Sequence, residues 1–265
     1  MKLRVPDRFR HLAPVETEMT RLGINADGGY VVPIESVRKS DGLVSLGISS
    51  EWSFDAEFLK IQKEARYIAC DRSSGFLVNF YSFLHSLLRK RDLSNGIPAL
   101  RSAFRFLRFC PPTSNRKTFI RKWVRGKVVD EAREICIDDL INRMENTRNI
   151  FLKIDIEGAE YEILPSVIKI HSEDKERFTC LCIEFHEIGS REEEFLNLIE
   201  QLLQHFDIVH MHANNCGGIS QDFPNVLEIT LVPTLSSSEN RVGFLPRAGL
   251  DFPNCPELDD ITLEF

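Results

Sequence analysis

The side chains best suited to chemistry fall at the ends of three apolar runs that predict β-strands. In a parallel α/β sheet the carboxyl ends of the strands meet at one edge, where ligands bind. Carboxylates and imidazoles placed there can polarise a bound hydroxyl, accept its proton or hold a cation. We therefore expect one functional cleft, with these candidate catalytic residues: Asp155, Glu157, Glu184, His186 and His212.

The central one of these runs, residues 149–156, passes without a linker into a helix-type pattern. Side chains alternate along a strand, so Lys153 and Asp155 share one face. Gly158 lies where the chain must bend, and glycine has no Cβ to obstruct a bend. Lys153 and Asp155 also fit a simpler interpretation, a buried ion pair that only supports the fold.

Two earlier segments predict a phosphate- or nucleotide-type binding site. The strand-type run 42–48 is followed by a turn of small residues and a helix, an order that presents backbone N–H groups to a ligand. Gly47 and Ser49 lie in this turn, which has fewer glycines than such turns usually contain. Asp71 ends the next strand, where an acidic residue can bind both hydroxyls of a ribose. A turn or helix-capping aspartate is the alternative interpretation.

The central stretch carries a family resemblance. The motif Lys153-Ile-Asp-Ile-Glu-Gly-Ala-Glu-Tyr161 resembles the signature of the FkbM-type methyltransferases, and Ile183-Glu-Phe-His186 fits the next strand of that family. The run Arg21-Leu-Gly-Ile-Asn-Ala-Asp-Gly-Gly-Tyr-Val-Val32 is similar to an entry motif of some members. The resemblance extends from Arg21 to about Pro233. It implies an α/β, Rossmann-like class I methyltransferase fold: a mostly parallel seven-stranded sheet with an antiparallel last strand.

The resemblance also implies a function. We expect an S-adenosylmethionine-dependent O-methyltransferase that acts on a hydroxyl of a small molecule, a sugar or a glycosylated metabolite. His186 would take the acceptor proton and Asp155 would orient the acceptor, with Asp27 or Tyr30 near the substrate. The cofactor residues are expected to be Gly47, Ser49, Asp71, Asp138 and Asp155.

Two other functions stay open at the level of sequence. A nucleotide-binding oxidoreductase could use a related sheet, but the Gly-x-Gly-x-x-Gly fingerprint is absent. A non-catalytic scaffold that kept the fold is consistent with the glycine-poor turn. Carboxylates and imidazoles also suit Mg, Mn or Zn, yet no closely spaced ligand motif is present, and we assign no metal.

Composition limits the possible partners and location. A net charge of −7 argues against general nucleic-acid binding, so we expect a small-molecule acceptor instead. The seven cysteines are odd in number and widely spaced, which predicts reduced thiols, and we assign Cys180 and Cys182 a core role. No run of eighteen apolar residues occurs, which excludes a transmembrane helix. We therefore expect a cytoplasmic protein.

The chain predicts one domain over residues 1–265, with an entry segment (1–40), a basic helical insertion (72–130) and a surface-wrapping tail (234–265). Between Arg89 and Lys127 there are twelve lysines and arginines and one acid, Asp92. Three interpretations stay open for this basic segment: a solvated face of a lid, a site for an anionic acceptor, or contact with a membrane surface. We expect it to border the acceptor side of the cleft, through Arg121 and Lys122.

Overall fold

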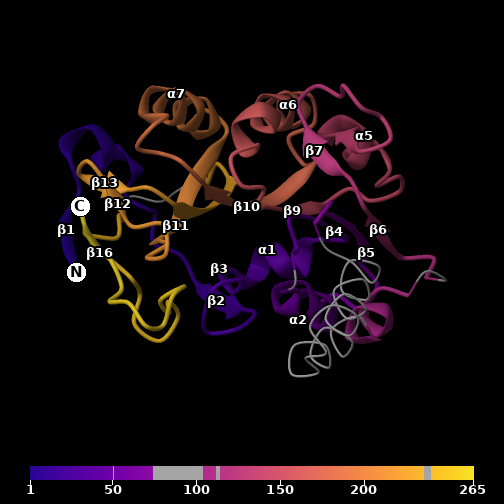
Figure 1. Ribbon diagram of the computed structural model, residues 1–265, viewed down its shortest axis with the longest axis horizontal. Coiled ribbons are helices and arrows are strands. Elements are labelled where there is room, and N and C mark those ends of the chain that lie inside the picture. The colour runs from indigo at the N-terminus through magenta and orange to yellow at the C-terminus, as the bar shows by residue number, and fades with distance from the viewer. Residues whose placement is uncertain (50, 74–103, 112–113, 236–239) are drawn as a thin grey trace, which may run out of the picture.

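A seven-stranded sheet forms the centre of the molecule (Figure 1). The computed structural model describes residues 1–49, 51–73, 104–111, 114–235 and 240–265. All neighbouring strands run parallel except at β14, which is antiparallel to both neighbours; this confirms the predicted sheet with its antiparallel last strand. The strand order is β11 (Phe206–Ala213), β14 (Leu227–Pro233), β10 (Phe178–Phe185), β9 (Ile150–Ile154), β4 (Gly42–Leu46), β5 (Arg66–Cys70) and β6 (Lys117–Ile120).

Helices cover both faces of the sheet (Figure 1), and each face has its own apolar core. Because both faces are covered, β4 and β9 are buried along their whole length, as expected for central parallel strands. No helix in the described ranges is long and apolar enough to span a bilayer. One face carries α5 (Ile137–Asn142), α6 (Glu160–Glu173) and α7 (Glu192–Leu203), and the other carries α1 (Ile34–Lys39) and α2 (Ser53–Ile61).

Short strands and one 3₁₀ helix, η1 (Asp7–Leu12), surround this central layer. The expected turn at Asp27 joins β2 to β3 as an antiparallel hairpin. The tail joins the N-terminus, because its last strand β16 pairs with β1. The small sheets consist of β2 (Met19–Leu22) with β3 (Tyr30–Pro33), β7 (Trp123–Arg125) with β8 (Glu134–Cys136), β12 (Ile219–Ser220) with β13 (Phe223–Pro224), and β1 (Lys2–Arg4) with β15 (Phe244–Leu245) and β16 (Thr262–Glu264).

The topology corrects two expectations. The three strands with polar ends are not all neighbours, since β14 lies between β10 and β11. Residues 117–120, expected inside the basic insertion, form the edge strand β6. Of the insertion's other residues, 74–103 and 112–113 lie outside the described part, so its expected helical character stays a prediction.

Candidate active site

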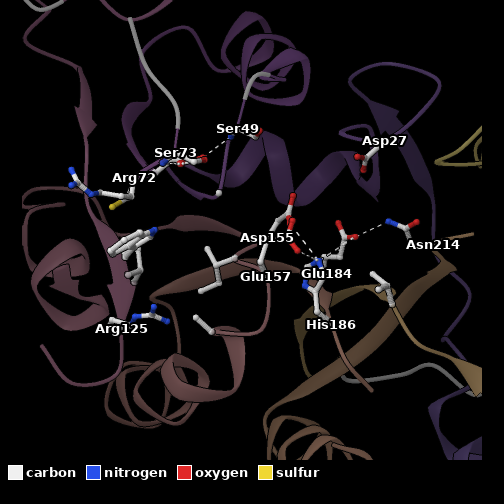
Figure 2. A pocket seen from close by; sticks show the side chains of 18 of the residues that line it. Asp27, Ser49, Arg72, Ser73, Arg125, Asp155, Glu157, Glu184, His186 and Asn214 are labelled. Atoms are coloured by element: carbon white, nitrogen blue, oxygen red, sulfur yellow. Dashed lines mark hydrogen bonds and ion pairs between the residues drawn. The ribbon is translucent and has the colours of Figure 1, made fainter. Parts of the chain in front are cut away.

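A pocket of about 680 Å³ opens over the carboxyl ends of β4, β5, β9 and β10. Its volume lies in the range of small-molecule and cofactor sites. Two ends can be distinguished in Figure 2, with Asp155 and Glu157 between them. The β5 end is lined by Gly47, Ser49, Asp71, Arg72 and Trp123, and the β10 end by Asp27, Asp155, Glu184, His186 and Asn214.

The turn after β4 determines the shape of the β5 end. Gly47 has a φ of +74°, and a Cβ there would lie 1.5 Å from the carbonyl oxygen of Asp155. Only glycine allows β4 and β9 to end this close together. Ser49 has a φ of +43°, so this serine also adopts the left-handed region. Left-handed non-glycine residues are strained and concentrate at functional sites.

Asp71 stands at the end of β5, as predicted, and faces the pocket. One carboxylate oxygen accepts the Ser49 N–H at 2.6 Å, and the other accepts the Ser73 N–H at 2.6 Å and its hydroxyl at 2.7 Å. Beside it, the Trp123 side chain presents a half-exposed indole to the pocket, with the Arg72 guanidinium 5.5 Å from a ring centroid. The β5 end therefore combines backbone, a carboxylate and an aromatic face.

At the β10 end, Asp155 is held through one oxygen. Its Oδ2 accepts the Tyr30 hydroxyl at 3.0 Å and lies 3.4 Å from the Lys153 ammonium. Burial opposes a charge on Lys153, but the carboxylates of Asp155 and Asp55 outweigh it and raise its pKa, so the lysine stays charged. The predicted ion pair of Lys153 and Asp155 is present, and Asp155 also faces the pocket.

Glu184 is almost completely buried beside Asp155. Its Oε1 accepts the Asn214 amide at 2.7 Å, and its Oε2 accepts the Tyr30 hydroxyl at 3.2 Å. Burial raises the pKa of Glu184 well above its ordinary value, and the charges of Asp155 and Glu228 add to this. One tyrosine hydroxyl thus bridges the two carboxylates that the sequence placed on neighbouring strands.

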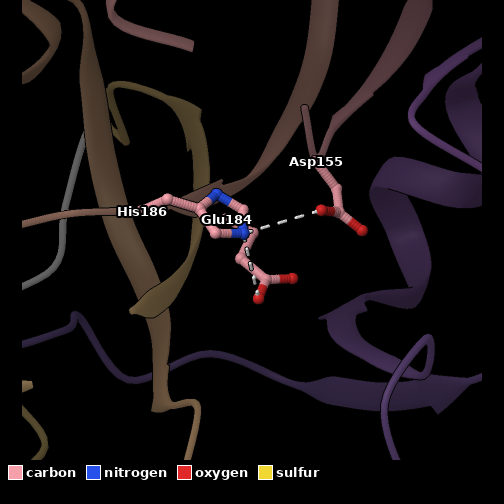
Figure 3. Close-up of side chains that lie close together, drawn as sticks. All are labelled: Asp155, Glu184 and His186. Carbon is pink, nitrogen blue, oxygen red and sulfur yellow. Dashed lines mark ion pairs between the residues drawn. The ribbon is translucent and has the colours of Figure 1, made fainter. Parts of the chain in front are cut away.

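His186 points its Nε2 atom toward these carboxylates (Figure 3). Nδ1 lies 3.2 Å from Glu160 Oε1, and the backbone N–H of His186 donates to the same oxygen at 2.7 Å. Burial alone would lower the pKa of His186, but the hydrogen bond that the ring donates to Glu160 and the charges of Glu184, Glu160 and Asp155 raise it to about 9. Nε2 lies 3.6 Å from Glu157 Oε2, 3.7 Å from Glu184 Oε1 and 4.0 Å from Asp155 Oδ1.

Two predicted site residues lie elsewhere. His212 is buried and contacts Asp260 at 3.2 Å and Glu228 at 3.7 Å, and it does not line the pocket. The intervening strand β14 separates it from β10. Asp138 lies in the first turn of α5, accepts a hydrogen bond from the Cys136 thiol and is likewise outside the pocket lining.

The tail is attached next to the β10 end by a disulfide. Cys216, which lines the pocket, is bonded to Cys255 of the tail. The expectation that all seven cysteines are reduced is therefore wrong for this pair, while Cys180 and Cys182 are free and buried as predicted. Disulfides persist mainly in oxidising compartments, so this bond does not support the expected cytoplasmic location. That location stays a prediction.

Part of the basic segment reaches the β5 end. Lys122 and Arg125 line the pocket together with Asp71, because β6 pairs with β5. Figure 2 shows Arg125 on the same side of the pocket as Arg72. The expectation that Arg121 and Lys122 border the acceptor stays a prediction. Residues 89–103 lie outside the described part, and the membrane and anion interpretations stay untested for them.

Three contributors to the pocket were not predicted in these roles. Glu160 was not among the predicted site residues, although its side chain is fully buried and contacts His186. Tyr30 was expected near the substrate, not as the bridge between two carboxylates. Trp123 was one aromatic among many basic residues, and only its position after a strand, three residues beyond Ile120, could have indicated the site.

Comparison with known proteins decides the family. Residues 6–217 match the methyltransferase FkbM domain, which is most of the chain. The protein is a member of the FkbM methyltransferase family. It is therefore an S-adenosylmethionine-dependent methyltransferase, and the oxidoreductase and scaffold alternatives are set aside. The match ends at Gly217, so the tail lies beyond the family domain.

Solved structures with a similar arrangement include a precorrin-6Y C5,15-methyltransferase from Geobacter metallireducens GS-15 (TM-score 0.38, 12% identity, covering 76% of this chain and 85% of that one). The fibrillarin pre-rRNA processing protein of Methanococcus jannaschii is also similar (TM-score 0.35, 13% identity, 75% and 68% covered). No curated protein matches the chain. The family assignment rests on the domain match.

Proposed function

We propose that this FkbM-family enzyme transfers the methyl group of S-adenosylmethionine to a hydroxyl of a small polyhydroxylated acceptor of the sugar class. The observation that carries the proposal is the composition of the β10 end: Asp27, Asp155, Glu184, His186 and Asn214 converge there from separate segments. Hydroxyl-rich ligands need several hydrogen-bond partners at once, and these five side chains supply both donors and acceptors.

The residues of the β5 end fit the methyl donor. Asp71 faces the pocket with a carboxylate suited to ribose hydroxyls, and the exposed indole of Trp123 offers a flat surface for an adenine ring. Bound S-adenosylmethionine supplies an activated methyl group on a positively charged sulfur. The site between the two ends is lined by Asp155 and Glu157, whose negative charges favour a cation there.

The chain's own residues then orient and activate the acceptor. Asp155 Oδ1 carries no hydrogen bond to another described side chain, so it can accept one from the acceptor hydroxyl, while Tyr30 and Lys153 hold Oδ2. In-line placement of the oxygen about 3 Å from the methyl carbon accounts for several kcal/mol of the barrier. The hydroxyl must lose its proton, and carboxylate and imidazole groups that can take part in that proton transfer lie together at Asp155, Glu184 and His186.

The proposal is tested by incubating the full chain with methyl-labelled S-adenosylmethionine and a panel of free, phosphorylated and nucleotide-linked sugars. Label should appear in a sugar product, and NMR should place the methyl group on oxygen. A panel of amines and thiols is the comparison set. Transfer to nitrogen or sulfur, with none to oxygen, would contradict the hydroxyl acceptor while leaving the family assignment intact.

A further inference from the structure

The Asp155–Glu184–His186 cluster has the spacing of ligands around one ion. One ligand atom from each residue lies within 4.8 Å of the other two. His186 Nε2 is 4.0 Å from Asp155 Oδ1 and 3.7 Å from Glu184 Oε1, which is too long for a hydrogen bond. Divalent ions bind such atoms at about 2.0–2.2 Å, so two ligands of one ion lie roughly 3–4 Å apart.

His186 and Asp155 are fixed through the atoms that point away from the cluster: Glu160 contacts His186 Nδ1, and Lys153 and Tyr30 hold Asp155 Oδ2. Glu184 is held at both oxygens, Oε2 by Tyr30 and Oε1 by the Asn214 amide, and Oε1 keeps a second lone pair for an ion. A histidine whose second ring nitrogen contacts a carboxylate is the usual arrangement of a metal ligand. If His186 were instead hydrogen-bonded to Asp155 or Glu184, its Nε2 atom would lie closer to their oxygens. The measured distances of 4.0 Å and 3.7 Å exclude such a bond.

The local charges also suit a cation. Asp155, Glu157 and Glu184 surround His186 Nε2 within 4.0 Å, and Lys153 is the cation in contact with Asp155. In the ligand form, with no proton on His186 Nε2 or on Glu184, these three carboxylates and one ammonium leave two negative charges. Glu184 is buried, where an uncompensated charge is costly. A divalent ion neutralises this excess.

We propose that Asp155 Oδ1, Glu184 Oε1 and His186 Nε2 bind a divalent cation of the Mn²⁺ or Mg²⁺ type, which holds the acceptor hydroxyl. Two carboxylates and one imidazole suit these ions, and three protein ligands leave positions for acceptor oxygens. The cation accepts a lone pair of the hydroxyl and eases loss of its proton. This inference rests on the proposed hydroxyl acceptor.

The assignment changes the role of His186 from base to ligand. The acceptor proton passes to Glu157, whose side chain is 86% exposed and can release it to water. The freed electron pair of the acceptor oxygen forms the new bond to the methyl carbon. The carbon–sulfur bond breaks with its electrons kept by sulfur, so that no oxidant or reductant is required.

The test is Mn²⁺ titration of the chelator-treated full chain by calorimetry, without donor or acceptor. The wild type should bind one Mn²⁺ per chain at saturation. His186→Gln should abolish saturable binding, and Glu160→Gln, which loosens the ring behind the ligand, should weaken it about 10–100-fold. Glu193→Gln removes an equal charge from an exposed position on α7 and should bind as the wild type does.

The results distinguish a failure of the cation site from a failure of the proposed function. Weak, non-saturating Mn²⁺ binding in the folded wild type, or equal affinity in all three variants, would overturn the cation site. If labelled sugar still forms at the full rate in EDTA, the cation is dispensable and the hydroxyl acceptor stands. If Mn²⁺ binds as predicted but only amines are methylated, the cation site stands and the proposed function fails.

Discussion

The two ends of the pocket are built in opposite ways. At the β5 end, the contacts come from main-chain groups within a few residues of a strand end. Asp71 accepts hydrogen bonds from the N–H groups of Ser49 and Ser73. At the β10 end, Tyr30 bridges Asp155 and Glu184 from a hairpin more than a hundred residues away in sequence. The first end is a surface turn, and the second is a buried polar network.

Because of this difference, substitutions at the two ends of the pocket should have different effects. Under the proposed function, a change at the β5 end should remove a contact to the methyl donor and leave the core unaffected. A change at the β10 end acts on a buried network, in which removing one partner leaves others unsatisfied and costs more than a surface contact. We therefore expect donor affinity to depend on the β5 end, and rate and stability on the β10 end.

The largest effect is expected for His186→Ala. Loss of a positioned proton-transfer group or metal ligand should lower kcat by about 10²–10⁴. Affinity for S-adenosylmethionine, measured by calorimetry, should change little, because His186 lies at the other end of the pocket from Ser49 and Ser73, which donate to Asp71 (Figure 2). A parallel collapse of donor affinity would remove the distinction between the two ends.

Removal of the disulfide should have the next largest effect. The bond between Cys216 and Cys255 closes a loop of 39 residues. The double variant Cys216→Ser/Cys255→Ser should lower the free energy of unfolding by about 2–4 kcal/mol, because the unfolded chain regains freedom. Denaturant unfolding measures the loss, and Cys136→Ser, which removes a free thiol, is the control with little expected change. Equal stability of both variants would show that the tail is held without the disulfide.

A moderate effect is expected for Asp71→Ala. The change removes the carboxylate that is proposed to bind the donor ribose and leaves the Ser49 N–H without its acceptor. Affinity for S-adenosylmethionine should fall by about 1–3 kcal/mol, measured by calorimetry. Thermal stability should remain close to that of the wild type, and unchanged donor affinity would show that the ribose lies elsewhere.

The last effect is a pH dependence of stability that arises from His212. Burial alone would lower the pKa of His212, but hydrogen bonds with Asp260 and Glu228 and the charges of Glu228 and Asp251 raise it to about 10. The folded chain thus binds this proton more tightly than the unfolded chain, whose histidine titrates near 6.5. The resulting stability is complete below about pH 6.5 and is lost as pH rises toward 10.

Between pH 7 and pH 9 this loss is at most about 1.4 kcal/mol per pH unit. His212→Gln should be less stable than the wild type at pH 7 and should lack this alkaline decline, which denaturant titrations at several pH values would detect. An identical alkaline decline in both proteins would assign it to other groups.

The sheet and the β5 end were largely predictable from sequence. Strands β4, β5, β9 and β10 each follow from an apolar run, and Gly47 and Asp71 follow from the order of strand, turn and helix. Such signals are local, because a strand end and its turn lie within a few residues.

The β10 end was predictable only in part. Asp155, Glu184 and His186 were correctly placed together, because neighbouring parallel strands end at one edge. His212 was wrongly placed with them, because β14 pairs between β10 and β11. That pairing depends on contacts between segments that are far apart in sequence. The burial of Glu160 also could not be predicted from its helix-start position, because it depends on the packing of His186 against α6.

The most direct test is Glu184→Gln, which keeps the shape of a buried side chain and replaces its carboxyl group by an amide. Two quantities are measured on the same preparation: affinity for S-adenosylmethionine by calorimetry, and the single-turnover rate of methyl transfer to the sugar acceptor. The account predicts unchanged donor affinity and a rate lower by about 10²-fold or more. A normal rate, or a loss of donor affinity as large as the loss of rate, would contradict it.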